Sequence, residues 1–294
     1  MDVKTRGLRE KMGKFGGLLR IMRPLNCIMM GFAVVVGAVL GFNQTINFDW
    51  LRVFYGAMTG FTLTAASMAL NDYYDRAIDA INEPKRPIPS GVVSPKEAVV
   101  LTIILCSVGF VFAFLTSPIC FGVSIIAWII LMAYVTVGKR SGLPGNFLVS
   151  ACVAIPFLYG SIVLLDYVPL NVLLFASMAF LSNTGREITK GIVDVKGDRS
   201  EGIKTLAVRY GENRAAFVAT SFYISAVCLT PIPVLLNLVT WIFIPIVLIT
   251  NFGLIASSAI LIKDHSREKA RKIKKLVLYW FLIGLLAYVF GVPW

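Results

Sequence analysis

The chain has 294 residues, of which 57% are hydrophobic and 15% are charged, and its formal net charge is +12. With a mean hydropathy of +0.78, this composition excludes an ordinary water-soluble domain and indicates a polytopic membrane protein. The five cysteines lie singly in apolar runs, so no disulfide framework is implied. His265, the single histidine, lies among charged residues and is expected to be a solvated loop residue, neither a metal ligand nor part of a Ser-His-Asp triad.

Residues 1–23 form a basic leader. Seven lysines and arginines fall in it, and leucine, methionine and phenylalanine recur at roughly helical spacing. This pattern predicts that part of the leader lies as a helix in the membrane interface. Arg23 and Pro24 then open the first long apolar segment.

Hydropathy predicts nine transmembrane helices and therefore an all-α integral membrane protein. We expect these helices to form a single domain over residues 1–294. The expected spans are 24–42, 52–73, 97–115, 118–137, 146–165, 168–190, 214–234, 238–262 and 273–292.

The first polar motif, residues 71–91, closes the second expected span. At about 100° per residue, Asp72 and Asp79 point almost the same way and Asp75 lies between them. Oxygen ligands on one helical face suit Mg²⁺, which takes a few carboxylates together with ligand phosphates. Prolines and a glycine then end the helix and shape a loop that carries Arg86.

A second motif of the same kind closes the sixth expected span. Asp194 and Asp198 are four residues apart, and they follow Glu187 and Lys190 on one helical face. A single charged cluster at a helix end is most often only solvated. Its repetition after another apolar helix favours two carboxylate clusters that share one metal-bound diphosphate.

The basic residues predict the orientation of the chain. With the N-terminus in the cytoplasm, 27 of the 28 lysines and arginines fall on the cytoplasmic side, and Arg52 alone lies outside. The cytoplasmic catalytic loops are then 71–96 and 186–214, and the C-terminus lies outside. The net charge is thus a topology signal, since no basic-aromatic module indicates nucleic acid. The polybasic stretch 263–275 is expected to meet anionic lipid headgroups.

The two motifs resemble the paired aspartate signature of the UbiA superfamily of intramembrane prenyltransferases. In this chain the signature reads Asn71-Asp72-x-x-Asp75-x-x-x-Asp79 and then Asp194-x-x-x-Asp198. Within the superfamily, segments 71–91 and 185–198 are most similar to those of archaeal digeranylgeranylglyceryl phosphate synthases. The resemblance covers nearly the whole chain and implies the UbiA-type fold, with its helices around a central cavity.

The expected chemistry is the departure of an allylic diphosphate assisted by two Mg²⁺ ions, which opposing carboxylate clusters hold. The expected catalytic residues are Asp72, Asp75, Asp79, Lys139, Asp194 and Asp198. The candidate metal ligands are Asn71, Asp72, Asp75, Asp79, Glu187, Asp194 and Asp198. The candidate substrate-binding residues are Arg23, Asn26, Asn71, Arg76, Arg86, Tyr134, Lys139, Arg186 and Lys190. The resemblance gives Arg76 and Lys139 to the diphosphate, and Arg23 and Asn26 to the acceptor headgroup, although Arg23 is an equally good membrane anchor.

For the activity, the resemblance implies transfer of a geranylgeranyl group from its diphosphate to the hydroxyl of geranylgeranylglyceryl phosphate, in archaeal ether-lipid synthesis. The expected partners are a prenyl diphosphate donor, a lipid-phosphate acceptor and membrane lipids, without an obligate protein partner. One alternative is a superfamily member that prenylates an aromatic acid such as 4-hydroxybenzoate, or haem. A more distant alternative is a transporter of cations or phosphorylated solutes, but acidic groups at mid-bilayer would favour a transporter, and these lie at helix ends.

Overall fold

The computed structural model describes residues 3–42 and 47–293, and in these ranges the chain is built from helices without a β-strand. The elements are α1 (Val3–Met22), α2 (Pro24–Gly41), α3 (Trp50–Asn82), α4 (Pro95–Thr116), α5 (Pro118–Thr136), the short 3-10 helix η1 (Gly138–Arg140), α6 (Leu143–Leu165), α7 (Leu170–Ser200), α8 (Leu206–Tyr210), α9 (Glu212–Leu229), α10 (Pro231–Leu235), α11 (Phe243–Lys263) and α12 (Arg267–Gly291).

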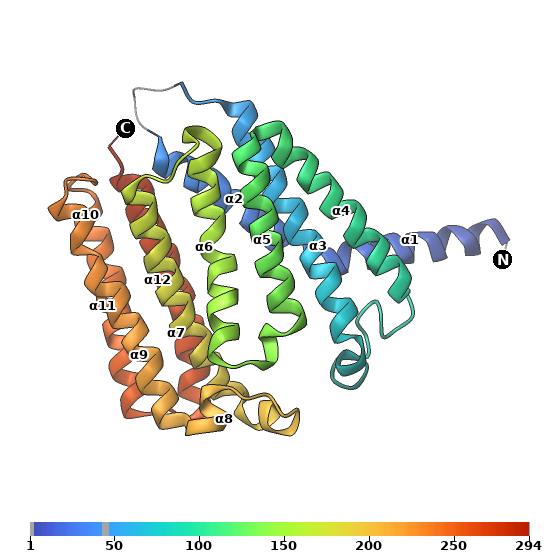
Figure 1. The fold of residues 1–294 in the computed structure, drawn as a ribbon. Coiled ribbons are helices and arrows are strands. Elements are labelled where there is room, and N and C mark those ends of the chain that lie inside the picture. The colour runs from blue at the N-terminus through green and yellow to red at the C-terminus, as the bar shows by residue number, and fades with distance from the viewer. Residues whose placement is uncertain (1–2, 43–46, 294) are drawn as a thin grey trace.

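The long helices form two groups that stand side by side (Figure 1). One group contains α2 to α6, and the other contains α7, α9, α11 and α12. Within the groups, α3 packs on α4, α2 on α6, α7 on α9 and α11 on α12, while the contact of α6 with α7 joins the two groups. The short helices α8 and α10 lie at opposite ends of the second group (Figure 1).

Eight helices in the described ranges are long and apolar enough to cross a membrane. A multi-pass, all-α membrane protein is thereby confirmed. The sixth expected span, 168–190, corresponds to α7, which is 31 residues long but carries the polar second motif in its C-terminal half. Because α7 is not among the eight, the count of nine stays a prediction.

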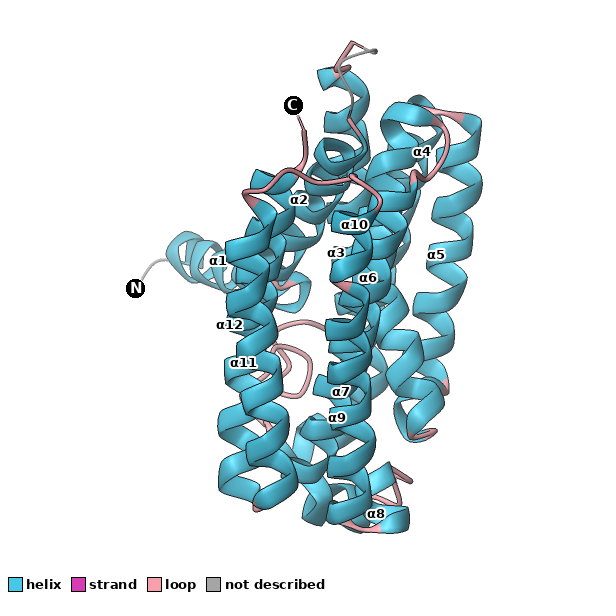
Figure 2. Cartoon of the chain, turned by 90° about the vertical axis from the view of Figure 1, so that its left-hand side faces the viewer, coloured by secondary structure: helices cyan, strands magenta, loops and turns pink. Residues whose placement is uncertain are grey.

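The basic leader is helical and projects away from the bundle as α1 (Figures 1 and 2). The chain turns at Arg23, whose backbone lies in the left-handed region with φ 51°, and α2 begins at Pro24. Near its end the leader packs on α3 and α4, where Ile21 belongs to one apolar cluster with Ala69 and Val93. This docking fixes the position of Arg23 relative to the end of α3.

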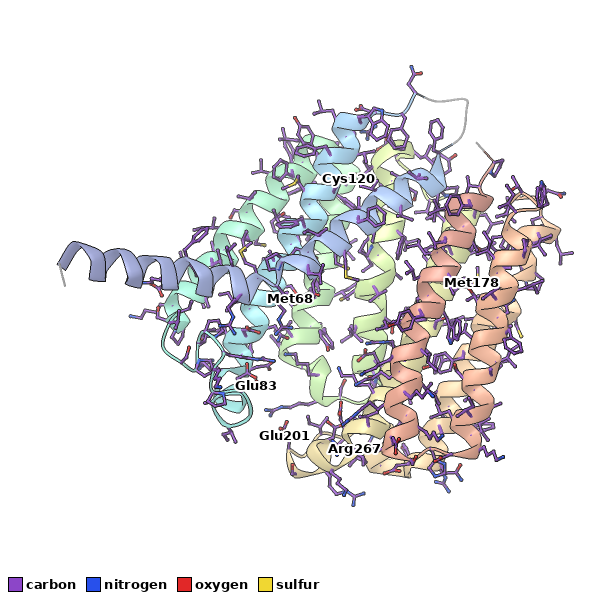
Figure 3. All side chains as sticks on the ribbon, turned by 180° about the vertical axis from the view of Figure 1, so that it is seen from behind. Met68, Glu83, Cys120, Met178, Glu201 and Arg267 are labelled. Atoms are coloured by element: carbon purple, nitrogen blue, oxygen red, sulfur yellow. The ribbon has the colours of Figure 1, made fainter. Side chains whose placement is uncertain are left out.

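The two polar motifs are largely helical. α3 continues through the first motif and α7 through the second, so much of 71–96 and 186–214, expected as loops, is helix. Glu83 after α3, Glu201 after α7 and Arg267 at the start of α12 lie at one end of the molecule (Figure 3). The aspartates therefore stand on rigid backbone at a shared end of the bundle.

The opposite end carries the one basic residue expected on the other side of the membrane. Arg52, in the first turn of α3, donates from Nη2 to Asp166 Oδ1 at 3.0 Å. Asp166 belongs to the turn between α6 and α7, at the end of the bundle away from α8 (Figure 1). The separation of charge along the bundle thus follows the expected pattern, while the side that faces the cytoplasm stays a prediction.

The backbones of α2 and α6 approach closely at two glycines. A Cβ added at Gly37 would lie 2.1 Å from the carbonyl oxygen of Phe157, and one added at Gly160 would lie 2.0 Å from that of Val34. Small residues permit this close contact between membrane helices. We call this contact, formed by Gly37 and Gly160, the glycine seam.

Replacing Gly160 by alanine should destabilise the protein, because the new methyl group meets backbone that cannot move without separating two helices. Overpacking of this kind typically costs about 1–3 kcal/mol. The melting temperature of the purified protein in detergent measures the effect. Gly122→Ala in α5 is the matched control, because nothing lies within 4 Å of its added Cβ. Equal melting temperatures for the two variants would contradict the prediction.

Candidate active site

Two buried aspartates of α3 share a pair of arginines from neighbouring segments. Arg23 Nη2 donates to Asp72 Oδ1 at 2.7 Å. Arg86 Nη1 donates to Asp79 Oδ2 at 2.6 Å and lies 3.9 Å from Asp72 Oδ1. The side chains of the two aspartates are 6% and 9% exposed. Since buried charges require compensation, these contacts tie the α1–α2 junction and the loop after α3 to the end of α3.

The third aspartate of α3 is held by a lysine from across the site. Lys139 Nζ donates to Asp75 Oδ2 at 2.7 Å, and Asn71 Nδ2 donates to the same oxygen at 2.9 Å. Lys139 lies in η1, directly after α5. Burial lowers the pKa of Lys139, and its hydrogen bond to Asp75 opposes that shift. A lysine so placed can exchange a carboxylate oxygen for a phosphate oxygen, because both are anionic acceptors.

The two aspartates of α7 are differently placed. Asp194 and Asp198 are both partly buried, and in the part of the chain that the structure describes neither forms an ion pair. Burial raises the pKa of Asp198, and the negative charge of Asp194 raises it further, while a hydrogen bond with Thr205 lowers it. Two neighbouring carboxylates without a bound cation are suited to accept a divalent one.

Glu187, expected as a further metal ligand, is occupied by its neighbours. Arg186 Nη1 lies 2.8 Å from Glu187 Oε1, and Lys190 Nζ lies 3.3 Å from Oε2. Glu187 precedes Asp194 by seven residues, or about two helical turns. The structure therefore groups Glu187 with these two cations rather than with the aspartate pair.

Tyr134, near the end of α5, lies within electrostatic range of residues on two other helices. Its charged neighbours are Asp75 on α3 and the pair Glu187 and Lys190 on α7. Because η1 follows α5 directly, the segment that carries Tyr134 also carries Lys139. The end of α5 is therefore close to both α3 and α7, and a single site bordered by both carboxylate clusters stays a prediction.

Two of the expected substrate-binding residues have no hydrogen bond or ion pair to either carboxylate cluster in the described part of the chain. The guanidinium of Arg76 lies over the ring of Tyr73, 4.4 Å from its centroid, and Nη1 donates to the Tyr73 carbonyl oxygen at 2.7 Å. Asn26 is exposed in the first turn of α2. From its place in the motif, Arg76 could reach either a bound diphosphate or the ring of Tyr73. The presence of Tyr73 three residues earlier was the feature of the sequence that indicated the second contact.

One cation at the second cluster was missed by the sequence reasoning. Lys274, on α12, interacts electrostatically with Asp194, Lys190 and Arg186. It belongs to the polybasic stretch 263–275, which was expected only to meet lipid headgroups. The sequence did contain a feature that could have indicated this position. Lys274 lies on the same helical face as the apolar residues that follow it in α12, and such a face is expected to point into the bundle.

The oxygen ligands of the site fit Mg²⁺ only in part. Within the described ranges, no three His, Cys, Asp or Glu side chains gather into a ready-made metal site. Mg²⁺ needs no such cage, since it commonly takes one or two carboxylates and completes its shell with waters and substrate phosphates. The aspartate pair of α7 and the aspartates of α3 are suited to that manner of binding.

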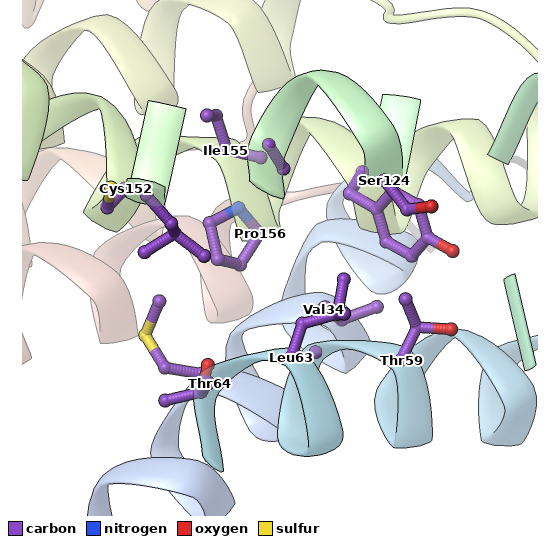
Figure 4. Close-up of a pocket in the computed structure, with 13 residues that line it drawn as sticks. Val34, Thr59, Leu63, Thr64, Ser124, Cys152, Ile155 and Pro156 are labelled. Carbon is purple, nitrogen blue, oxygen red and sulfur yellow. The ribbon is translucent and has the colours of Figure 1, made fainter. Parts of the chain in front are cut away.

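Two hollows lie among the helices that carry the site. A cavity of about 60 Å³ is enclosed by α2, α3, α5 and α6, where Val34, Thr59, Leu63, Ser124 and Pro156 are among its lining residues (Figure 4). A pocket of about 610 Å³ lies between α12 and the helices α6, α7, α9 and α11, with one residue of α2 at its border. Only the second falls in the size range of about 300–1,000 Å³ that is typical of ligand pockets.

The sequence model of the UbiA prenyltransferase family matches residues 30–286. The chain belongs to the UbiA prenyltransferase family. Its relatives include the digeranylgeranylglyceryl phosphate synthase of Korarchaeum cryptofilum, which is 36% identical over 276 residues, with 94% of this chain and 96% of that protein covered.

Solved structures of UbiA proteins show the same fold. A structure from work on digeranylgeranylglyceryl phosphate synthase in membranes has a TM-score of 0.84 and 28% identity, and the alignment covers 95% of this chain and 98% of that one. A UbiA homologue from Archaeoglobus fulgidus, bound to GPP and Mg²⁺, has a TM-score of 0.65 and 18% identity, covering 92% and 99%. The UbiA fold of the present chain is therefore confirmed.

Proposed function

We propose that this UbiA-family enzyme transfers the geranylgeranyl group of geranylgeranyl diphosphate to the free hydroxyl of geranylgeranylglyceryl phosphate. The observation that carries the proposal is the 36% identity to the synthase of Korarchaeum cryptofilum over nearly the full length of both chains. The similarity in fold to the structure from work on such a synthase supports it. The product has two ether-linked isoprenoid chains on one glycerol phosphate, as archaeal membrane lipids require.

The donor diphosphate is placed between the two carboxylate clusters. Asn71 and the three aspartates of α3 face it from one side, and Asp194 and Asp198 from the other. Two bound Mg²⁺ ions would neutralise the negative charge that develops on the departing diphosphate. The related Archaeoglobus fulgidus structure, bound to GPP and Mg²⁺, supports the choice of Mg²⁺ as cofactor.

The basic residues of the first cluster take the remaining diphosphate oxygens. Lys139, Arg86 and Arg23 donate to aspartates in the free protein, and each can donate instead to a phosphate oxygen as the ligand enters. As the allylic C–O bond breaks, positive charge develops on the prenyl carbon. The aromatic face of Tyr134 stabilises that charge and excludes water until the acceptor oxygen forms the ether bond. The proton of the acceptor hydroxyl then passes to the departing diphosphate.

The active site is assigned to the cytoplasmic face of a single transmembrane domain. This orientation places α1, the segments 71–96 and 186–214 and the start of α12 on the cytoplasmic side, and the C-terminus outside. It rests on the distribution of lysine and arginine. Cysteine labelling at positions 85 and 196, in a background without the native cysteines, tests it, and labelling of the two from opposite sides would refute a shared active site.

The choice of acceptor is tested with purified protein and labelled geranylgeranyl diphosphate. Geranylgeranylglyceryl phosphate and 4-hydroxybenzoate are supplied at equal concentrations, and product formation is followed for each. We expect turnover with the lipid phosphate and little with the aromatic acid. Faster prenylation of the aromatic acid would overturn the acceptor assignment and leave the fold and diphosphate site intact.

Arg86→Ala should raise the KM for the donor by about tenfold or more, because a charge-assisted contact to a phosphate contributes about 1.5–3 kcal/mol. Lys85→Ala is the matched control, since Lys85 is an exposed cation in the same loop. Steady-state kinetics with varied geranylgeranyl diphosphate separate the two. A similar KM for both variants would show that Arg86 serves only to hold Asp79.

A further inference from the structure

Lys274 is a partly buried cation beside the second carboxylate cluster. In the described part of the chain it makes no ion pair and no hydrogen bond. The charged groups that face it are Asp194, Lys190, Arg186 and Glu187. Glu187 accepts from both Arg186 and Lys190, so Lys274 is a third cation on this side of the site, with Asp194 as the facing carboxylate that has no ion pair in the described ranges. A phosphate can accept from several such donors at once, because each of its oxygens is an anionic acceptor.

The packing of α12 on α7 sets the level of Lys274. The two helices run in opposite directions (Figure 1), and Arg267 Nε donates to the carbonyl oxygen of Val193 at 3.0 Å. Lys274 lies seven residues further along α12, about two turns or ~10 Å. Moving the same distance back along α7 from Val193 leads to Arg186. Lys274 and Arg186 therefore stand at the same depth, on helices that pack against each other.

Lys274 also begins the stripe of α12 that lines the large pocket. Residues spaced by four and three share a helical face. This stripe consists of Lys274, Leu278, Phe281, Leu285 and Tyr288. Its last four members line the pocket of about 610 Å³, whose lining also includes Lys275, the next residue after Lys274. From Leu278 to Tyr288 this apolar face runs for about 15 Å along the helix. A cationic end on a long apolar slot fits a lipid with an anionic headgroup and an extended chain.

We propose that the acceptor lipid binds along α12, with its phosphate at Lys274 and Arg186 and its isoprenoid chain in the pocket of about 610 Å³. The assignment rests on the proposed function. The other hollow, of about 60 Å³, is too small for such a chain. Arg23, expected at the acceptor headgroup, is instead paired with Asp72 and belongs to the donor side. The two phosphates thus have separate sets of cations, one around α3 and η1 and one between α7 and α12.

The headgroup half of the proposal is tested with Lys274→Ala. We expect the KM for geranylgeranylglyceryl phosphate to rise about tenfold or more, and the KM for the donor to change less than about twofold. Lys274→Arg should restore most of the acceptor affinity, and Lys272→Ala, which removes an exposed cation from a neighbouring position of α12, is the control. A larger rise in donor KM than in acceptor KM, or no change in acceptor KM, would overturn the proposal.

The chain half is tested at Gly284. This residue lines the pocket, and a Cβ built on it meets Thr250 at 3.4 Å, an ordinary contact. Gly284→Leu should therefore fold and extend into the pocket. We expect it to lower kcat/KM for the twenty-carbon acceptor about tenfold more than for an acceptor with a ten-carbon chain. If donor length matters instead, the pocket holds the donor chain and the proposal is wrong. If the parent protein itself does not prenylate the acceptor, it is the proposed function that fails.

Discussion

Asp75→Asn and Asp198→Asn should each reduce turnover by about a hundredfold to a thousandfold, because each removes a carboxylate that would hold the Mg²⁺ needed to stabilise the leaving diphosphate. Asp75 also holds Lys139 at 2.7 Å, so its loss frees a cation as well as removing a ligand. Asp198 belongs to the pair on α7 that has no ion-pair partner in the described part of the chain. Loss at both positions is required if the two clusters act on one diphosphate.

The measurement is single-turnover product formation with saturating donor and acceptor, on variants that remain monodisperse in detergent. Glu268→Gln is the control, since Glu268 is an exposed acid in the first turn of α12 outside both clusters. It should retain the activity of the parent. Activity within tenfold of the parent for either aspartate variant would refute the arrangement with two clusters.

Removing Mg²⁺ should abolish turnover, and donor and Mg²⁺ should stabilise the protein together far more than either does alone. No three potential ligands gather in the described ranges, and all three aspartates of α3 are paired with cations. Each partner therefore supplies what the other lacks: the diphosphate completes the coordination shell, and Mg²⁺ screens the diphosphate from the carboxylates. Such coupling is reciprocal.

Melting temperatures with EDTA, with Mg²⁺, with geranylgeranyl diphosphate and with both ligands measure this coupling without relying on activity. We expect the shift with both to exceed the sum of the separate shifts. Ca²⁺ should restore little turnover, because it favours six to eight ligands in looser geometry. A full shift with Mg²⁺ alone would reveal a preformed metal site and contradict the prediction.

The sequence was sufficient for the features that depend on local periodicity. Apolar runs of the right length predicted the membrane helices, and helical spacing alone placed the aspartates of α3 on one face. The weak point was α7, where one helix combines a span with the polar second motif. The apolar part of α7 is too short for composition alone to identify it as a membrane span, so the ninth span stays a prediction.

Features that depend on the packing of distant segments could not be read from the sequence. Arg23 reaches Asp72 because the chain turns at a left-handed residue and the leader docks on α3. Arg76 folds onto Tyr73, although its place in the motif equally permitted a contact with substrate. Lys274 gains its role from the register of α12 on α7, which Arg267 helps to set. In each case, a long side chain could reach several partners, and only the packing of distant segments decides which partner it contacts.

The glycine seam has a consequence for how such proteins can diverge. Between Gly37 and Gly160 there is no side chain that could be exchanged for a larger or smaller one, so this contact cannot be retuned by small steps. The lining of the large pocket is the opposite case, since Leu278, Phe281 and Leu285 can each be replaced by other apolar residues with a modest change in volume. The shape of the pocket can therefore change by single substitutions, while the contact of α2 with α6 cannot.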